Sequence, residues 1–458
     1  MTQAAPRRNQ RRQKKRRPKP TSRDILAGLF MAAWICVLMQ GALRKWIFPG
    51  VTVLYLIQDV PLLIAYIYAF RKGLVWGGKV AWTCIVLAIV VSIQTMLQFI
   101  MGDLTLRMGV IGLHHYIFYL PILFLAPVCY NHKHRLRFLR WNLLIILPMA
   151  MIAALQSRAP KGAWINRTSA GDDTAFGLEG DVVRASGTFN FSMTYDIWCG
   201  MAVALVLGEW LIPPGERSFK SKALLLVCTL GAVLATLVSG ARSAVALAAM
   251  GFLGGLAAVV VTRNFRLILR FTSLLILVPV LGTIAYMVAP GSLQGVLDRF
   301  TAEGTEQNLT ARITHGFVGF ATEPKFSLLG AGTGYGIPAA NPTAGTSFAI
   351  ILSEHDTIRI VQELGTFTGS AVVLARYAAG VLLLFAAFKC LSMTRGHSFP
   401  HAVPLAFAVA PTLMIGEVIR SAPVIATQAF FCVALVAGAI LFRREPLDAA
   451  PVQLSEMR

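Results

Sequence analysis

The stretch SAVALAAMGFLGGLAAVVVT, residues 243–262, contains no charged side chain. A helix needs about 20 apolar residues to cross the roughly 30 Å hydrocarbon core of a bilayer, so this stretch predicts a membrane-spanning helix. Similar runs recur along the whole chain of 458 residues, of which 56% are hydrophobic and 14% are charged. A soluble protein of this length does not bury so much apolar surface. The sequence therefore argues against a soluble multidomain enzyme.

Working outward from 243–262, we find runs that reach or approach the length of a membrane span throughout the chain. We predict an all-α, polytopic membrane protein with about 12 transmembrane helices and a large periplasmic loop between spans nine and ten. The predicted spans lie near 25–43, 51–70, 80–100, 109–130, 141–155, 196–212, 223–239, 243–262, 271–289, 366–388, 400–417 and 423–442.

The formal net charge of +21 is concentrated at one end, because the tail 1–23 is rich in Lys and Arg and has no acidic residue before Asp24. Loops that alternate with the spans carry most of the other bases, which predicts that both termini are cytoplasmic. We expect a disordered tail at 1–23 that attracts anionic lipid, a membrane domain at 24–442 and a cytoplasmic tail at 443–458. The remaining charge forms short clusters and no continuous stripe, which argues against a nucleic-acid partner.

Polar residues gather in two predicted outside loops, 156–195 and 290–365, where we expect the function to reside. No CxxC pair occurs among the seven cysteines, so a thiolate metal site is not indicated. Four carboxylates in the first loop are numerous enough to hold a cation, but bases in the same loop balance them. We therefore assign no residue as a metal ligand. Whether the four carboxylates of this loop bind a cation stays open: Asp172, Asp173, Glu179 and Asp181.

Four arginines near helix ends or in loop motifs are predicted to face the outside: Arg184, Arg242, Arg312 and Arg359. A guanidinium pairs with phosphate oxygens through two parallel hydrogen bonds, so several arginines that converge would suit a diphosphate. Each one alone also fits an interfacial anchor or a salt-bridge partner. Inside the predicted spans, Asp59 and Arg376 are costly charges that we expect to pair or to line a polar cavity.

His355 opens a segment in which His355, Arg359 and either Gln362 or Glu363 recur at helical spacing. Histidine suits proton transfer near neutral pH, so His355 is a candidate general base that takes a proton from a sugar hydroxyl. His315 in the same loop is a weaker candidate. The run LLGAGTGYGIP, 328–338, alternates glycines and predicts either a flexible turn or a close backbone approach to a ligand.

The ordered set of motifs RASGTF, SGARS, a long loop with RxxxGF and GxGxG, and then HDxxxxxxELGxxxG, within roughly 180–390, resembles the bacterial O-antigen polymerase and O-antigen ligase superfamily. The resemblance implies an integral membrane glycosyltransferase of the bacterial inner membrane that needs neither nucleotide nor metal cofactor. Its donor would be an undecaprenyl-diphosphate-linked glycan and its acceptor a glycan or a lipid-linked glycan. Polysaccharide-assembly proteins are the macromolecular partners that it implies.

By position, the resemblance makes Arg184 and Arg242 diphosphate-binding residues, adds Arg312 as a further basic position, and makes His355 the essential loop histidine. Asp356 and Glu363 would support this site, although Asp356 stands where the family usually has Asn.

Two other functions stay open on the sequence. A carrier or flippase of lipid-linked sugars would concentrate ionisable residues within its spans. A noncatalytic component of a polysaccharide export assembly would tolerate replacement of Arg242 and His355.

Overall fold

The computed structural model describes residues 20–74, 78–130, 132–167, 183–212, 222–263, 265–288, 309–322, 328–336, 355–391 and 400–416, with a few isolated positions at 290–297. These residues form helices and no strand, which confirms the all-α prediction for this part of the chain. The basic tail, the acidic cluster at 172–181, the twelfth predicted span and the C-terminal tail lie outside the described residues.

Seven segments are long and apolar enough to cross a membrane in the described part of the chain. They lie at Ser22–Ile47, Val53–Arg71, Lys79–Ile100, Leu106–Cys129, Lys133–Arg158, Arg242–Thr262 and Thr366–Leu391. The chain is therefore a multi-pass helical protein, and the count of twelve spans stays a prediction.

The N-terminal half begins with α1 (Ser22–Ala42). Thr21 and Asp24 form a reciprocal capping box at its start, and a π-helical turn, η1 (Leu43–Ile47), follows its end. The other elements follow in chain order: η2 (Thr52–Leu56), α2 (Asp59–Arg71), α3 (Lys79–Ile100), α4 (Leu106–Ile117), α5 (Ile122–Cys129), α6 (His132–Arg158) and η3 (Trp164–Asn166). The predicted span 109–130 is thus two helices. The predicted span 141–155 is part of a longer helix.

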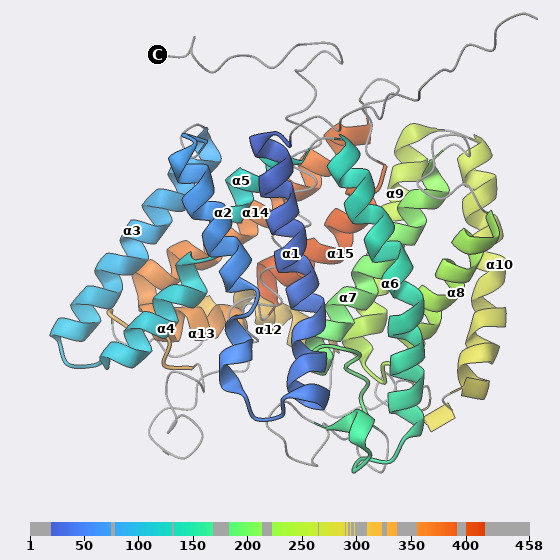
Figure 1. Cartoon of the computed structure of the whole chain (residues 1–458), viewed down its shortest axis with the longest axis horizontal. Coiled ribbons are helices and arrows are strands. Elements are labelled where there is room, and N and C mark those ends of the chain that lie inside the picture. Colours follow the sequence, from blue (N-terminus) through green and yellow to red (C-terminus); the bar gives the residue numbers. More distant parts are fainter. Residues whose placement is uncertain are drawn as a thin grey trace, which may run out of the picture.

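The C-terminal half contains α7 (Ser192–Leu211), α8 (Lys222–Leu237), α9 (Arg242–Thr262), α10 (Phe265–Val288), α12 (Leu309–Thr322), α13 (Asp356–Leu364), α14 (Thr366–Leu391) and α15 (Ala402–Ile415). The described part of the predicted outside loop 290–365 therefore includes the helices α12 and α13. These short helices lie in the lower half of the view among the ends of the long ones (Figure 1).

Helix α7 is central, because nearly all of its residues are buried, and it packs on α9, α8 and α15. It can approach α9 closely because both helices carry small residues at the contact. A side-chain carbon at Gly200 would lie 2.8 Å from Leu247 Cβ, and one at Gly251 would lie 3.3 Å from Ala204 Cβ. Such small-residue contacts are the usual means by which helices pack within a membrane, where lipid is as apolar as leucine.

These contacts define the direction of α7 and α9. Along the two helices the paired positions increase together, from Gly200 with Leu247 to Ala204 with Gly251, so the helices are parallel. Gly208 of α7 meets His401 at the start of α15, and Gly254 of α9 meets Phe407, so α15 packs on both helices.

Candidate functional site

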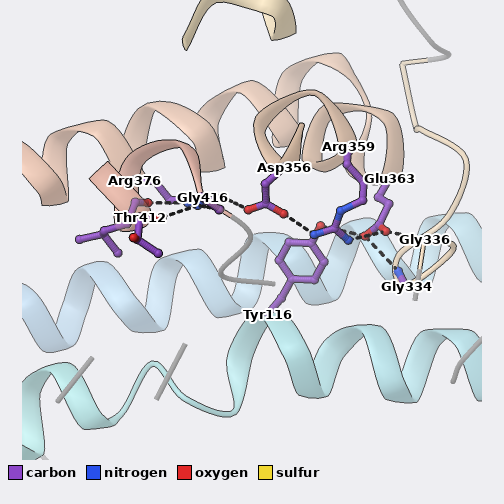
Figure 2. Close-up of polar contacts among 10 residues, drawn as sticks. Tyr116, Gly334, Gly336, Asp356, Arg359, Glu363, Arg376, Thr412 and Gly416 are labelled. Carbon is purple, nitrogen blue, oxygen red and sulfur yellow. Dashed lines mark hydrogen bonds and ion pairs between the residues drawn. The ribbon is translucent and has the colours of Figure 1, made fainter. Parts of the chain in front are cut away.

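A buried ionic network surrounds α13. Asp356, Arg359 and Glu363 lie on one face of this helix, at helical spacing, and each is at most 1% exposed. Arg359 pairs with Asp356 through Nη2, and its Nη1 donates to Glu363 Oε1 at 3.0 Å. Arg376 of α14 pairs with the other oxygen of Asp356 (Figure 2). The network thus contains two acids and two bases.

Arg376 also connects this network to the end of α15. Its Nε donates to the backbone oxygen of Leu413 at 2.8 Å, and its Nη2 donates to that of Gly416 at 2.8 Å (Figure 2). Backbone oxygens at a helix C-terminus lack partners within the helix and carry partial negative charge, so they stabilise a cation. Arg376 therefore joins α13, α14 and α15.

The charges of the network stabilise one another. Burial by itself would raise the pKa of the Asp356 carboxyl, but the guanidiniums of Arg376 and Arg359 outweigh it and hold that pKa below its ordinary value. Burial by itself would lower the pKa of the Arg359 guanidinium, but the carboxylates of Glu363 and Asp356 outweigh it and hold that pKa above its ordinary value. Asp356 and Arg359 therefore stabilise each other's charged form.

The glycine-rich run 328–336 closes over the end of this network. The amide of Gly336 donates to Glu363 Oε1 at 2.9 Å and the Tyr116 hydroxyl donates to Oε2 at 2.9 Å. The Gln98 side chain accepts from the Thr333 amide at 2.8 Å and donates to the backbone oxygen of Glu363 at 2.7 Å. The glycine run therefore packs closely on the backbone and side chain of Glu363, and its approach to a ligand stays a prediction.

We predict that Gly365→Ala strongly destabilises this region. Gly365 has φ +82°, and a side-chain carbon there would lie 2.0 Å from the backbone oxygen of Leu328. The backbone strain alone costs about 1–3 kcal/mol, and the clash adds to it. Thermal unfolding in detergent should show a clear fall in the midpoint temperature.

The control is Gly28→Ala in α1, where a side-chain carbon meets nothing within 4 Å. It should leave the midpoint temperature within about 2 °C of wild type, since removing a helical glycine changes stability by about 1 kcal/mol. Equal midpoints for the two variants would contradict the prediction.

His355 immediately precedes α13, at its N-cap position, and is partly accessible. Its ring lies 4.8 Å from that of His315 on α12, in an edge-to-face arrangement. Thr357 fixes this contact, because its hydroxyl donates to the backbone oxygen of Gly316 at 2.7 Å. The two histidines that the sequence offered as competitors are therefore neighbours.

A second polar cluster lies where α7 and α9 begin. Ser243 donates to the Asp196 carboxylate at 2.5 Å, Asp196 is 3% exposed, and Arg184 acts on it electrostatically. Arg242 is the first residue of α9. The N-terminus of a helix carries partial positive charge, so Arg242 adds to a potential that attracts anions. The sequence analysis did not single out Asp196 or Ser243, although SGARS contains the serine.

The structure places several candidate residues differently from our expectation. Arg359, expected at a diphosphate, is buried between Asp356 and Glu363, and we assign it to the scaffold. Asp59 does not pair with Arg376. It accepts from the Tyr119 hydroxyl at 2.5 Å and contacts His114 Nε2 at 3.0 Å. Arg312 lies in α12, three residues before His315.

Asp356 and Glu363 lie in the helix that follows His355 and make the contacts given above, and their support of a functional site stays a prediction. Arg184 and Arg242 lie on elements that meet at one level of the bundle, since Ser243, next to Arg242, binds the acid on which Arg184 acts. Asp172, Asp173, Glu179 and Asp181 lie outside the described residues. Within the described residues no cluster of three metal-binding side chains occurs.

Comparison with known proteins finds no match of this chain to a family model, to a curated protein or to a solved structure.

Proposed function

We propose that this chain is an integral membrane glycosyltransferase of the bacterial inner membrane. It would transfer or polymerise glycan from an undecaprenyl-diphosphate-linked donor onto a sugar hydroxyl at the periplasmic face, as an O-antigen ligase or polymerase does. One observation carries the proposal. A partly accessible histidine, His355, immediately precedes a helix that a buried ionic network holds in place. Arg184 and Arg242, beside Asp196 and Ser243, would provide the positive charge.

The chemistry needs a base on one side of the anomeric carbon and positive charge on the other. The acceptor hydroxyl oxygen attacks the anomeric carbon, and His355 takes the hydroxyl proton as the new bond forms. The bond from the anomeric carbon to the phosphate oxygen breaks, and its electron pair leaves with the lipid diphosphate. Arg184 and Arg242 would stabilise the charge that develops there. No acid is needed for a leaving group that departs as an anion.

The surroundings of His355 fit this role. Asp356 of the buried network directly follows His355, so the network holds the start of α13 in place. A catalytic group must be held within a fraction of an ångström, and rigid elements achieve this better than loops. His315 faces His355 and is placed to orient its ring or to contact the acceptor.

One observation favours the alternative of a transporter. Asp59 of α2 and His114 of α4 form a 3.0 Å pair inside two segments that are long and apolar enough to span a membrane. Ionisable groups in such segments often mark a proton or substrate path. The two functions differ in an observable product, because a carrier moves the lipid-linked sugar without breaking its diphosphate bond.

The test compares wild type with Arg242→Gln, using purified protein, undecaprenyl-diphosphate-linked glycan and an acceptor glycan. We expect wild type to form transferred or extended glycan. We expect Arg242→Gln to lower kcat/KM by about a hundredfold, as removal of one donor to a developing oxyanion does. Arg71→Gln, which changes an exposed arginine at the end of α2, is the matched control and should retain the wild-type rate. If labelled lipid-linked glycan crosses the vesicle membrane and no transferred glycan forms, the chain is a transporter and the proposed enzyme function is wrong.

A further inference from the structure

Lys45 is a buried cation in η1 whose described partners are neutral. It is 1% exposed, and its Nζ donates to Ser186 Oγ at 3.0 Å and to the backbone oxygen of Gly187 at 2.8 Å. No carboxylate lies within ion-pair distance of it in the part of the chain that the structure describes. A buried ammonium without a counter-charge is unfavourable, so a lysine in such a place tends to lose its charge unless an anion binds beside it.

The neighbouring Arg44 is in the same situation. It is 9% exposed, its guanidinium lies 5.4 Å from the centre of the Tyr55 ring, and its buried Nε has no hydrogen-bond partner among the described residues. A buried N–H that is left unsatisfied costs free energy and is uncommon in native structures. Arg44 and Lys45 occupy a π-helical turn, and such turns are frequent at functional sites.

The segment that Lys45 contacts is the RASGTF motif at 184–189. Successive turns of α1 pack on it without a gap, since a side-chain carbon at Gly41 would lie 2.3 Å from the backbone of Phe189. One residue earlier, Gln40 accepts from the Asn190 side chain at 3.3 Å. Gln156 of α6 holds the other side, where its Oε1 accepts from the amides of Ser186 and Gly187 at 3.1 and 2.8 Å. The segment is therefore fixed, and Lys45 is held against it.

The same segment carries Arg184, two residues before Ser186. Asp196 is one acid on which Arg184 acts. Lys45 and Arg44 have no carboxylate of their own among the described residues, and an anion such as a phosphate group would supply the missing negative charge.

We propose that Lys45, with Arg44 beside it, extends the cationic site of Arg184 onto the end of α1 and binds the phosphate groups of the lipid-linked donor. This inference rests on the proposed function for its ligand. Lys45 reaches the ligand past Ser186, which then shares the same phosphate oxygens, and Arg44 supplies its free Nε–H. The RASGTF motif is the link between the two sources of charge.

The experiment measures binding of undecaprenyl diphosphate to purified protein in nanodiscs, with inorganic diphosphate as competitor and uncharged undecaprenol as reference. Lys45→Met keeps the length of the side chain and removes its charge, and we expect it to raise the Kd for undecaprenyl diphosphate at least tenfold, the size of one lost charge-assisted hydrogen bond. Arg44→Gln should act in the same direction. Lys45→Arg keeps the charge and should remain within about threefold of wild type.

The matched control is Lys72→Met, at an exposed lysine that follows α2, which should bind as wild type does. If Lys45→Met binds undecaprenyl diphosphate normally, or if undecaprenol binding falls equally, the inference is overturned and Lys45 is a packing residue. If Lys45→Met does not fold, Lys45→Arg and Arg44→Gln decide the question by the same comparison. If Lys45→Met loses binding of undecaprenyl diphosphate while the wild type binds it but transfers no glycan, the inference is upheld and the proposed function is rejected.

Discussion

Replacement of Arg359 by methionine is expected to destabilise the folded protein by about 3–5 kcal/mol, the cost of leaving a buried partner charge uncompensated. Arg359 lies between Asp356 and Glu363, and all three are at most 1% exposed. Without it, Glu363 retains only the Tyr116 hydroxyl and the amides of the glycine-rich run. The free energy of unfolding in mixed micelles, measured by titration with denaturing detergent, gives the effect.

Two further variants make this prediction specific. Glu363→Gln added to Arg359→Met removes the stranded charge, so the double variant should recover part of the lost stability, which a packing role for Arg359 would not produce. Arg71→Met, at an exposed position, should have no measurable effect. Equal stability of wild type and Arg359→Met would contradict the assignment of Arg359 to the scaffold.

The same network predicts the direction of a pH effect. The pKa of the Asp356 carboxyl is lowered in the folded protein. Its stabilising contribution is therefore present above the ordinary pKa of an aspartate, about 4, and is lost as the pH falls below that value.

Replacement of His355 by glutamine is expected to lower the rate of glycan transfer by about 10²–10⁴-fold, the usual contribution of a general base. The glutamine keeps a polar side chain of similar size at the start of α13, and the Asp356 network below it is untouched. Fold and lipid binding should therefore persist. Initial rates with saturating donor and acceptor measure the effect on kcat.

His315→Gln and His114→Gln are the comparisons for this prediction. His315 touches His355 and should have a smaller effect, whereas His114 pairs with Asp59 in α2 and should leave the rate of transfer nearly unchanged. A His355→Gln protein that turns over at the wild-type rate would remove His355 from the mechanism. A large loss in His114→Gln alone would point instead to the Asp59 pair.

Local sequence patterns predicted much of the fold. Apolar runs such as 243–262 indicate helices because length and composition are properties of one segment, and α9 begins and ends within a residue of that prediction. The spacing of His355, Arg359 and Glu363 likewise predicted α13. The division of the span 109–130 into α4 and α5 was missed, although Pro121 lies directly before α5.

The partners of each charge were not predictable, because they depend on contacts between distant segments. Arg359 looked like the other outside arginines, and only the folded chain shows that two acids of its own helix enclose it. Arg376 and Asp356 meet across a helix junction, and Asp196 receives Ser243 from another helix. Lys45 carried no signal in the sequence beyond its charge at the end of an apolar run. Its contact with Ser186 joins segments 141 residues apart.

The central claim is glycosyl transfer from a lipid-linked diphosphate, and its most direct test is the stoichiometry of a single turnover. Purified wild-type protein is mixed in excess with undecaprenyl-diphosphate-linked glycan and acceptor, and both the new glycosidic product and the released undecaprenyl diphosphate are quantified over time. The account predicts that the two appear together in equal amounts. Donor that stays intact, or lipid diphosphate that is released without any glycan joined to the acceptor, would contradict it.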